Sequence, residues 1–321
     1  MIKVDLGIFA HNEAAGIAQM LGFVQAQRLP DGVDLRILVL ANGCRDDTAA
    51  QARAAGAEVA ELAEGGKSRT WNRFTRGLAR RDAQILIFAD ADIEMLERDV
   101  LARLIQGLCA RPELWVLSSQ PVKDTALRGA KTLVEKLALK ASGGLDDWRT
   151  AICGQLYAMP AARARRFRLP IGLPVEDGYL RAMVLTDNLT APEDVFRIDG
   201  AEGVRHIYAS ERSLGALIRH QERIVIGSAV NAALFAHLTE ASKPRAEARL
   251  LASDPQALGR VLAARLPRFP QGYVPLHFLV KRLARASLKR LPIAVIGFGF
   301  DLIVYIKAQI RMMRGGGAGF W

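Results

Sequence analysis

The sequence predicts an α/β fold, with a doubly wound, mostly parallel sheet followed by a helical C-terminal region. Short, almost wholly apolar runs alternate with helical patterns in the first part of the chain. This alternation is typical of parallel strands that are covered on both faces. From about residue 213 onward, apolar residues recur mostly at helical spacing. The length of 321 residues allows two domains, so we expect a sheet domain over 1–212 and a helical region over 213–321.

Each expected strand is a short apolar run bounded by polar or turn residues. The expected strands are 4–10, 35–41, 58–62, 84–90, 115–122 and 153–159. Helical patterns lie at 14–27, 46–55, 68–80 and 175–185. In a doubly wound sheet, ligands bind outside the carboxyl ends of the strands. The residues that directly follow each strand are therefore the first candidates for function.

Polar side chains follow three of the expected strands. Asp90 and Asp92 end the apolar run Ile-Leu-Ile-Phe. Glu13 follows the first strand and Asn42 follows the second. An Asp-x-Asp pair suits a hard divalent cation such as Mg²⁺ or Mn²⁺, which can also hold phosphate oxygens. The alternatives for the pair are a solvated turn and a carboxylate pair for acid–base chemistry.

Two helix starts carry further candidates. Lys67 follows two glycines at the start of a helical pattern, where a lysine can bind phosphate. The Walker A spacing is absent, and a solvated lysine is the alternative. Glu176 and Asp177 begin another helical pattern. A carboxylate there can act as general base toward a hydroxyl, or it can simply stabilise the helix start.

The positive charge is concentrated in the last third of the chain. Residues 213–321 hold 16 Lys and Arg against 5 Asp and Glu, which accounts for the whole net charge of +11. Within this region, 291–306 is apolar except for Asp301, and it is shorter than the roughly 20 residues of a spanning helix. Basic residues flank it on both sides, which favours an anionic membrane surface. A buried core helix is the alternative.

The cysteines and the N-terminus bear on the cellular compartment. The three cysteines are odd in number and widely spaced, which argues against a disulfide framework and a zinc site and fits a reducing compartment. The first residues lack the pattern of a signal peptide. We therefore expect a cytoplasmic protein.

Six motifs, taken in order, resemble those of family 2 glycosyltransferases with the GT-A fold. They are AHNEAAGI (10–17), VLANGCRDDTAAQA (39–52), GGKSRTWNRFTRGLA (65–79), FADADIEM (88–95), CGQLYAM (153–159) and VEDGYL (175–180). The resemblance covers about the first 225 residues. It implies a Rossmann-like GT-A sheet, a nucleotide-sugar donor and a hexosyltransferase type of activity.

The resemblance also implies a role for each residue at the strand ends. Glu13 and Asn42 would hold the nucleotide base, usually uracil, although the family commonly has Asp where this chain has Asn42. Lys67 would lie near the nucleotide. Asp90 would contact the ribose and the metal, and Asp92 would ligate Mg²⁺ or Mn²⁺ on the diphosphate. A UDP-sugar is the donor that these roles favour.

On the acceptor side, Asp177 matches the catalytic base of the family and Glu176 lies beside it. Processive members carry Q-x-x-R-W, of which only Arg223 is retained, between His220 and Ile224. Arg223 would then touch the diphosphate, and a single inverting sugar transfer is expected rather than polymer synthesis. The basic, apolar C-terminus is similar to that of membrane-associated members. It implies a lipid or glycan hydroxyl acceptor and a place at the inner face of the cell membrane.

Two alternatives from other classes remain open at this point. A nucleotidyltransferase using a sugar phosphate could share the core, but such enzymes usually have a glycine-rich basic loop where this chain has AHNEAAG. A nonenzymatic protein with a degenerate GT-A domain could bind membranes or nucleic acid through its basic region. No helix-turn-helix, zinc-finger or RNP-like signature is present, so no nucleic-acid partner is expected.

Overall fold

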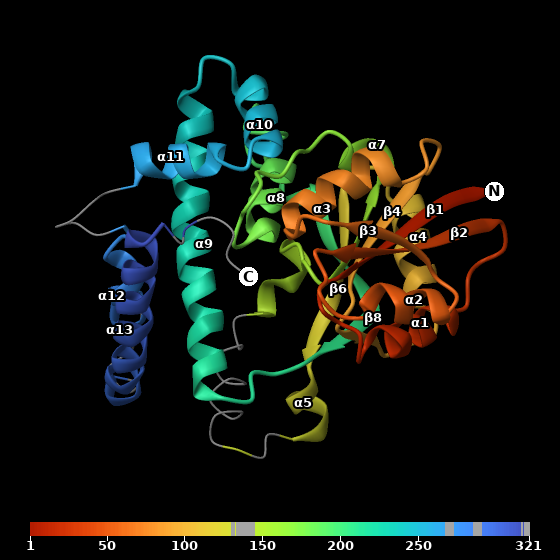
Figure 1. Cartoon of the computed structure of the whole chain (residues 1–321), viewed down its shortest axis with the longest axis horizontal. Coiled ribbons are helices and arrows are strands. Elements are labelled where there is room, and N and C mark those ends of the chain that lie inside the picture. The colour runs from red at the N-terminus through yellow and green to blue at the C-terminus, as the bar shows by residue number, and fades with distance from the viewer. Residues whose placement is uncertain (130–131, 133–144, 267–272, 285–290, 316, 318–321) are drawn as a thin grey trace. The chain divides into compact units, whose positions relative to one another are not determined.

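The computed structural model describes residues 1–129, 132, 145–266, 273–284, 291–315 and 317. The chain forms two compact units (Figure 1). The first unit contains Met1–Leu169 and Glu176–Ser210, and the second contains Pro170–Val175 and Glu211–Trp321. The short segment Pro170–Val175 therefore belongs to the second unit, although both of its neighbours in sequence belong to the first.

Within the described residues, the first unit holds an eight-stranded sheet. Its strands are β1 (Ile2–Ala10), β2 (Val33–Asn42), β3 (Glu58–Leu62), β4 (Ile85–Asp90), β5 (Ile93–Met95), β6 (Val116–Lys123), β7 (Leu156–Pro160) and β8 (Ile198–Tyr208). The strand order is β3-β2-β1-β4-β7-β6-β8-β5, and β1 to β4 pair in parallel. The mostly parallel α/β sheet predicted from the sequence is confirmed.

One strand runs against its neighbours at the centre of this sheet. β7 is antiparallel to both β4 and β6, with Ala89 opposite Leu156. The amino end of β7 therefore lies beside the carboxyl end of β4. The sequence gives no direction for a strand, so this proximity was not expected. It brings the residues just before β7 next to Asp90.

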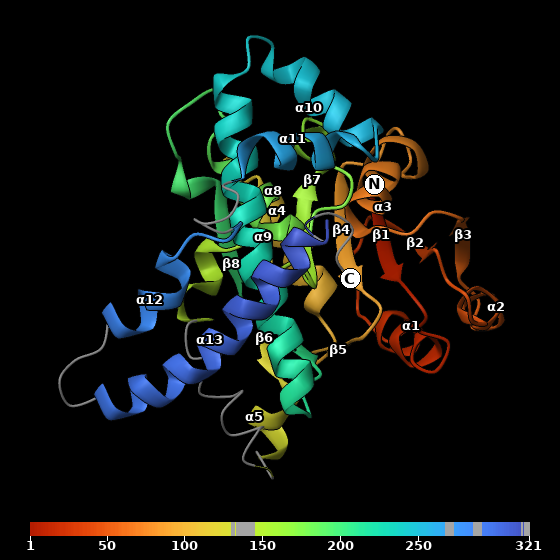
Figure 2. The same ribbon diagram turned by 60° about the vertical axis from the view of Figure 1, so that its left-hand side comes forward.

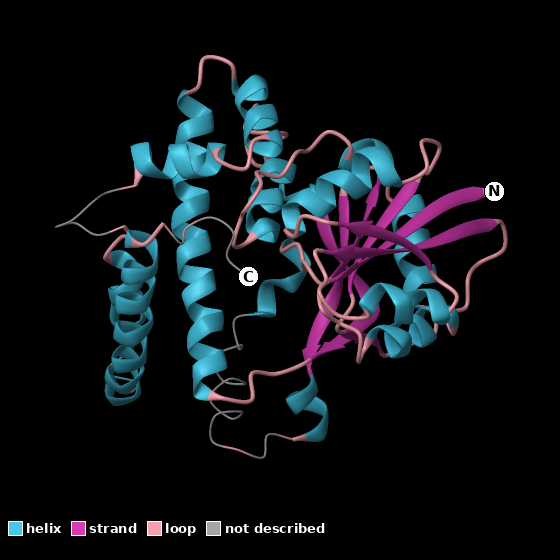
Figure 3. Ribbon diagram, in the orientation of Figure 1, coloured by secondary structure: helices cyan, strands magenta, loops and turns pink. Residues whose placement is uncertain are grey.

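Helices cover both faces of the sheet, as Figure 3 shows. The α-helices described in this unit are α1 (Ile17–Gln25), α2 (Thr48–Ala54), α3 (Lys67–Arg73), α4 (Val100–Ala110), α5 (Asp124–Arg128), α7 (Ala161–Ala164) and α8 (Glu176–Leu185), with a π turn at Phe74–Leu78. Alternate residues of β1, such as Leu6 and Ile8, share one buried cluster with Leu21 of α1 and Leu104 of α4. Because side chains alternate across a strand, the other face of β1 and β4 is left for α3.

Aromatic rings fill the layer between α3 and the sheet. Phe88 of β4 stacks on Tyr157 of β7 and on Trp71 of α3, with ring centroids 4.6 and 5.6 Å apart. The Trp71 indole N–H donates to the Tyr157 hydroxyl at 2.8 Å. Stacked pairs of this kind contribute about 0.5–1.5 kcal/mol each beyond area burial. They fix α3 on the strand that ends at Asp90, and Lys67 is the first residue of that helix.

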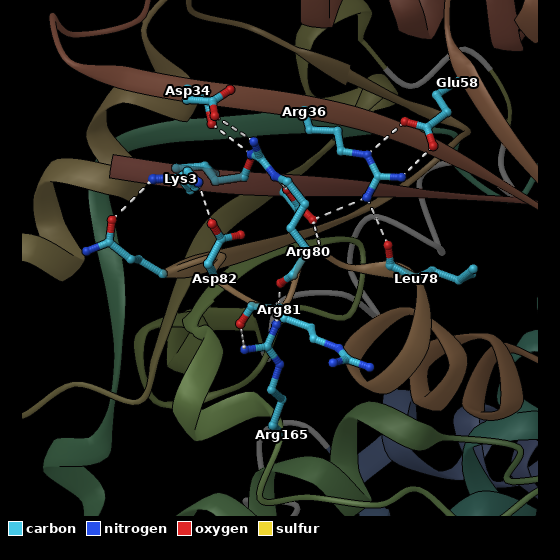
Figure 4. A network of polar contacts seen from close by, with 12 residues as sticks. Lys3, Asp34, Arg36, Glu58, Leu78, Arg80, Arg81, Asp82 and Arg165 are labelled. Atoms are coloured by element: carbon cyan, nitrogen blue, oxygen red, sulfur yellow. Dashed lines mark hydrogen bonds and ion pairs between the residues drawn. The ribbon is translucent and has the colours of Figure 1, made fainter. Parts of the chain in front are cut away.

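A polar network lies in the amino-terminal half of β1, away from the carboxyl ends of the strands (Figure 4). Asp5 is fully buried, and the Arg80 backbone N–H and Nε each donate to its carboxylate at 2.6 Å. Arg80 also donates through Nη1 to Asp34 at 2.6 Å, and Arg36 donates to the Leu78 carbonyl at 2.8 Å. These bonds tie the chain that follows α3 back to β1 and β2.

The second unit is helical throughout the part that the structure describes. Its helices are α9 (Leu214–Glu240), α10 (Pro244–Ser253), α11 (Ala257–Arg265), α12 (His277–Ala284) and α13 (Leu291–Met313). α13 packs against α9, with α12 beside it (Figure 2). No helix within the described ranges reaches the length and apolar character that crossing a bilayer requires.

Candidate active site

The parallel register brings the carboxyl ends of β1, β2 and β4 together at one edge of the sheet. Ala10 pairs with Ala41, and Phe9 pairs with Asp90. The loop after β1 is tied to the start of α2, because the backbone N–H of Glu13 donates to the hydroxyl of Thr48 at 2.8 Å. Residues that are distant in sequence therefore converge at this edge, as the doubly wound pattern predicts.

A lysine lies at the centre of this edge between two carboxylates. Lys67 Nζ is 2.7 and 2.8 Å from the two carboxylate oxygens of Asp90, and 3.2 Å from Oε1 of Glu176. It also donates to the Gly154 carbonyl at 3.1 Å. The three charged side chains are each between 15 and 22 % exposed. The structure thus brings together α3, β4, α8 and the loop before β7 around one ammonium group.

Burial and charge shift the pKa of both partners in this cluster. Burial alone would lower the pKa of Lys67, but the nearby Asp90 and Glu176 outweigh it and raise that pKa, so the lysine stays charged. Burial raises the pKa of Asp90 to about 7. Lys67 opposes that rise, while the charges of Asp92 and Glu176 add to it. Negative charge is therefore in excess around Asp90.

Two further carboxylates increase this excess. Asp92 is exposed, just beyond the end of β4. The pKa of Glu13 is raised by burial first, and then by the charges of Asp92 and Asp46. Among the residues described, no group of three or more His, Cys, Asp or Glu is arranged to hold a metal ion by itself. A hard cation here would combine one or two carboxylates with phosphate oxygens, which is how Mg²⁺ usually binds.

Asp177 belongs to the same edge through its contact with Gly154. A Cβ built on Gly154 would lie 3.2 Å from Cβ of Asp177 and 3.3 Å from its Oδ2. Gly154 is also the residue whose carbonyl accepts from Lys67. The Asp177 Oδ1 accepts from the backbone N–H of Gly178 at 2.7 Å. Asp177 and Lys67 therefore both lie next to the same glycine.

The residues before β7 were not assigned a role from the sequence. Besides Gly154, the Gln155 carbonyl accepts from the Asp90 backbone N–H at 2.8 Å. The Gln155 side chain is 3.1 Å from Nε2 of His206, a fully buried histidine whose Nδ1 is 2.6 Å from the Ser119 hydroxyl. From the sequence, Gly154 was expected inside a strand over 153–159, within the motif CGQLYAM, and was given no role of its own. Its position becomes informative once β7 is known to run antiparallel to β4.

The second base-binding candidate is enclosed by its own fold. Asn42 is 2 % exposed, and its Oδ1 accepts from the hydroxyl of Thr70 at 2.8 Å. After it, Gly43 has a φ of 60°, and a Cβ there would lie 2.8 Å from the backbone of Gly65. Glu13 thus follows β1, whereas Asn42 ends the neighbouring strand β2 and is bonded to α3. Arg223 lies on α9 in the second unit, and its role toward a diphosphate stays a prediction.

An α/β sheet with carboxylates at its parallel strand ends and a lysine among them suits the binding of phosphate groups and a cation. Comparison with known families is more specific. The family model for glycosyl transferase family 2 matches residues 5–170, just over half of the chain. The chain therefore belongs to glycosyl transferase family 2, and the family predicted from the motifs is confirmed.

Curated relatives match over a shorter stretch. The 4,4'-diaponeurosporenoate glycosyltransferase of Staphylococcus aureus strain MRSA252 is 27 % identical over 149 residues, which cover 44 % of this chain and 39 % of the relative. The same protein from strain USA300 gives the same identity and coverage. The chain thus spans about two-fifths of the length of the curated relatives that it matches.

Solved structures confirm the fold. The mannosyltransferase PcManGT from Pyrobaculum calidifontis, determined with GDP-Man and Mn²⁺, has a TM-score of 0.54 at 20 % identity and covers 99 % of this chain and 87 % of its own. Mannosyl-3-phosphoglycerate synthase from Rubrobacter xylanophilus has a TM-score of 0.51 at 16 % identity and covers 75 and 77 %. At these identities the likeness establishes the GT-A type of fold alone.

Proposed function

We propose that this chain transfers one sugar from a nucleoside diphosphate sugar to a hydroxyl acceptor, with inversion at the anomeric carbon. The observation that carries the proposal is the contact of Asp177 with Gly154, whose carbonyl accepts from Lys67. A carboxylate that can take a proton is therefore adjacent to the cluster that would hold the diphosphate. The family supports the reaction type, since its members are glycosyl transferases.

In the proposed step Asp177 removes the proton of the acceptor hydroxyl. The oxygen attacks the anomeric carbon from the face opposite the diphosphate and forms the new glycosidic bond. The bond between that carbon and the phosphate oxygen breaks, and its electron pair leaves with the nucleoside diphosphate. The proton ends on Asp177, and no oxidant or reductant is required. Lys67 balances part of the negative charge that grows on the leaving group.

Of the two adjacent acids, Asp177 is the better candidate for the base. The Glu176 carboxylate is 3.2 Å from Lys67, which ties it to the cluster that would hold the diphosphate. Asp177 lies against Gly154, and it is the residue that matches the catalytic base of the family. We infer that Glu176 helps to hold Lys67 in place while Asp177 acts on the acceptor.

The residues at the strand end fit a divalent cation. Asp92 is exposed and Asp90 is next to it, and both offer hard oxygen donors in a site with excess negative charge. We propose Asp92 as the main ligand of Mg²⁺ or Mn²⁺ and Asp90 as the second, with Asp90 also near the ribose. When bound, the cation neutralises charge on the diphosphate.

We propose that Glu13 and Asn42 lie nearest the nucleotide base. They lie at the carboxyl ends of the paired strands β1 and β2, and a base bound there would leave the diphosphate toward Lys67 and Asp90. A UDP-sugar is our first candidate. PcManGT was determined in complex with GDP-Man, so a GDP-sugar is the second candidate to test.

The reaction is tested by incubating the protein with UDP-glucose, UDP-galactose or GDP-mannose and Mn²⁺ and measuring the nucleoside diphosphate released. For the active donor, Asp177→Asn is expected to lower kcat by about 10²- to 10⁴-fold with little change in donor affinity. Asp82→Asn, the same exchange at an exposed ion pair with Lys3, is the matched control. Unchanged turnover in Asp177→Asn would refute the base assignment, and no release from any donor would refute the proposed reaction.

We further propose a lipid or lipid-linked acceptor, reached from an anionic membrane surface. The exposed apolar residues of α13 fall at positions separated by three, four or seven, or directly adjacent, which places them on one stripe. They are Val295, Leu302, Ile303, Ile306, Ile310 and Met313. Lys307, Arg311 and Arg314 are exposed on the same helix and its end. An apolar stripe beside cations suits a helix lying in the interface of an anionic bilayer.

This membrane proposal is tested by sedimentation with vesicles of phosphatidylserine and phosphatidylcholine. The protein is expected to bind vesicles that contain phosphatidylserine, and Ile303→Glu with Ile306→Glu is expected to abolish binding. Phe196→Glu, at an exposed aromatic residue of the first unit, is the control and should bind normally. Equal binding by the double variant would refute the proposal.

The three cysteines are free, which supports the cytoplasmic face as the location.

A further inference from the structure

The loop before β7 contacts two of the charged side chains that the proposed reaction uses. The Gly154 carbonyl accepts from Lys67 at 3.1 Å, and a Cβ on Gly154 would lie 3.3 Å from the Asp177 Oδ2. All three residues belong to the first unit. The position of the lysine relative to the proposed base therefore depends on how this glycine is held.

β6 holds the loop through two consecutive serines. The Ser118 hydroxyl donates to the Ala151 carbonyl at 3.1 Å and accepts from the Cys153 backbone N–H at 3.3 Å. The Ser119 hydroxyl donates to the Leu156 carbonyl at 2.9 Å. Neighbouring residues of a regular strand point to opposite faces, but the pairing of β6 with β8 is irregular directly after Ser118. Irregularities of this kind re-aim side chains, and here both hydroxyls reach one loop.

The Ser119 hydroxyl also fixes the proton of a buried histidine. His206 of β8 is fully buried, and its Nδ1 is 2.6 Å from that hydroxyl. Because the single hydroxyl hydrogen of Ser119 goes to the Leu156 carbonyl, the hydroxyl oxygen must accept from Nδ1–H. Burial lowers the pKa of His206 to about 3, so the ring is neutral and its Nε2 carries a lone pair.

That lone pair faces both neighbours of Gly154. The His206 Nε2 is 3.8 Å from the Cys153 Sγ and 3.1 Å from the side-chain amide of Gln155. Burial raises the pKa of the Cys153 thiol to about 12, so the thiol keeps its hydrogen and can donate it. The Gln155 amide must present its NH₂ group to Nε2, since its oxygen cannot donate. One nitrogen atom therefore connects the residues before and after the glycine to β8.

We propose that His206 and Ser119 are positioning residues for the reaction. They hold the two neighbours of Gly154 and so position the lysine and the proposed base, which this glycine contacts. An apolar residue could fill the volume of the histidine without buried polar atoms that need partners, but it could not supply an acceptor to both neighbours. The inference rests on the proposed function, because that function gives Asp177 and Lys67 their roles.

Two substitutions separate the nitrogen atoms of His206. The amide of His206→Asn reaches only the position of Nδ1 and can keep the bond to Ser119, whereas that of His206→Gln reaches the position of Nε2. Nucleoside diphosphate release is measured from the active donor, and hydrogen exchange is measured on peptides that cover 151–157. His206→Asn should exchange faster there and lose about 10- to 100-fold in kcat, with little change in the KM for the donor. His206→Gln should keep most of the kcat.

Two further variants separate positioning from lost stability. Arg80→Lys weakens the network around Asp5 and should keep the kcat of the wild-type protein. Cys153→Ala with Gln155→Leu removes both partners of Nε2 while the histidine stays in place. This double variant should lose kcat as His206→Asn does. Adding His206→Asn to it should cost little more, because residues of one network are not additive.

The possible results are distinguishable. An unchanged kcat in His206→Asn would overturn the inference, as would equal losses in His206→Asn and His206→Gln. If both variants fail to fold, unchanged turnover in the variant with Cys153→Ala and Gln155→Leu would overturn it. If the wild-type protein releases nucleoside diphosphate from no donor, the proposed function fails. Faster exchange at 151–157 in His206→Asn alone would then still support the hold of His206 on the loop, and unchanged exchange would refute it.

Discussion

The first unit contains two networks built from a strand carboxylate and a cation, and their differences separate stability from function. In the amino-terminal half of β1, Asp5 is fully buried and accepts two bonds from Arg80. At the carboxyl end of β4, Asp90 is about one-fifth exposed and is paired with Lys67. The carboxylate at the centre of the first network is therefore closed off from water, whereas the carboxylate of the second borders it.

The two cations also differ in what they leave unsatisfied. The planar guanidinium of Arg80 donates to Asp5, to Asp34 and to main-chain carbonyls in fixed directions. Lys67 is a compact charge that must serve both Asp90 and Glu176, and burial and then the charges of Asp92 and Glu176 raise the pKa of Asp90. One network has matched its charges internally. The other has an acidic excess, which a bound cation would relieve.

The largest effect is expected from breaking the network around Asp5. Arg80→Met leaves Asp5 buried without its main partner and should lower the free energy of unfolding by about 3–5 kcal/mol. Urea unfolding followed by circular dichroism measures it. Arg80→Lys should lose less, because it keeps the charge but not the fork. A loss below about 1 kcal/mol in Arg80→Met would contradict the structural role of this network.

A smaller effect is expected at the buried His206, close to the network around Lys67. Burial lowers the pKa of His206 to about 3, below the roughly 6.5 of an unfolded histidine. Its stabilising contribution is therefore complete above pH 6.5 and is lost as the pH falls toward 3. Between pH 7 and pH 5 the loss should be about 2 kcal/mol.

The measurement for His206 is the free energy of unfolding of wild type and His206→Asn at both pH values. The wild-type protein should lose about 2 kcal/mol more than the variant on acidification, even though the variant is less stable at pH 7. Equal losses in the two proteins would show that folding does not lower the pKa of His206.

The smallest effect is expected from replacing Asp92 by Asn. The same exchange at Asp5 should change the free energy of unfolding in the opposite direction. In EDTA, Asp92→Asn should raise the free energy of unfolding by no more than about 1 kcal/mol, since it removes a like charge that acts on Asp90 and Glu13. The same exchange at Asp5 should be destabilising, because it weakens the bonds from Arg80. Destabilisation by Asp92→Asn in EDTA would mean that the network around Lys67 has no excess of negative charge.

The sequence predicted most of the parallel half of the sheet. The six expected strands are all present, with ends shifted by at most three residues, because buried parallel strands leave long apolar runs. In contrast, β8 (Ile198–Tyr208) was not predicted, because its residues mix glycine, charged and apolar types and are only partly buried. α4 was not predicted either, although apolar residues recur there at helical spacing.

The candidate site was predicted in part. Lys67, Asp90, Glu176 and Asp177 were chosen individually, and the structure brings them together around Gly154. That gathering depends on the antiparallel direction of β7, which no local pattern encodes.

Contacts between residues far apart in the chain could not be predicted from the sequence either. The bond of Asn42 with Thr70 and the contact of Val175 with Gly227 join residues that are 28 and 52 positions apart. Neither pair has a composition or spacing that would have indicated the contact. Such pairs become visible only when the fold is known.

The most direct test of the central claim is a thermal-shift measurement with UDP, GDP, CDP and dTDP, with and without Mn²⁺, on wild type and Asp92→Asn. A ligand that binds the native state stabilises it by mass action, by about 2.7 kcal/mol at a ligand concentration of a hundred times Kd, and so raises the melting temperature. If the acidic edge is a donor site, one nucleotide should raise the melting temperature only with Mn²⁺, and Asp92→Asn should lose the shift. No shift with any nucleotide, or an undiminished shift in Asp92→Asn, would contradict the account.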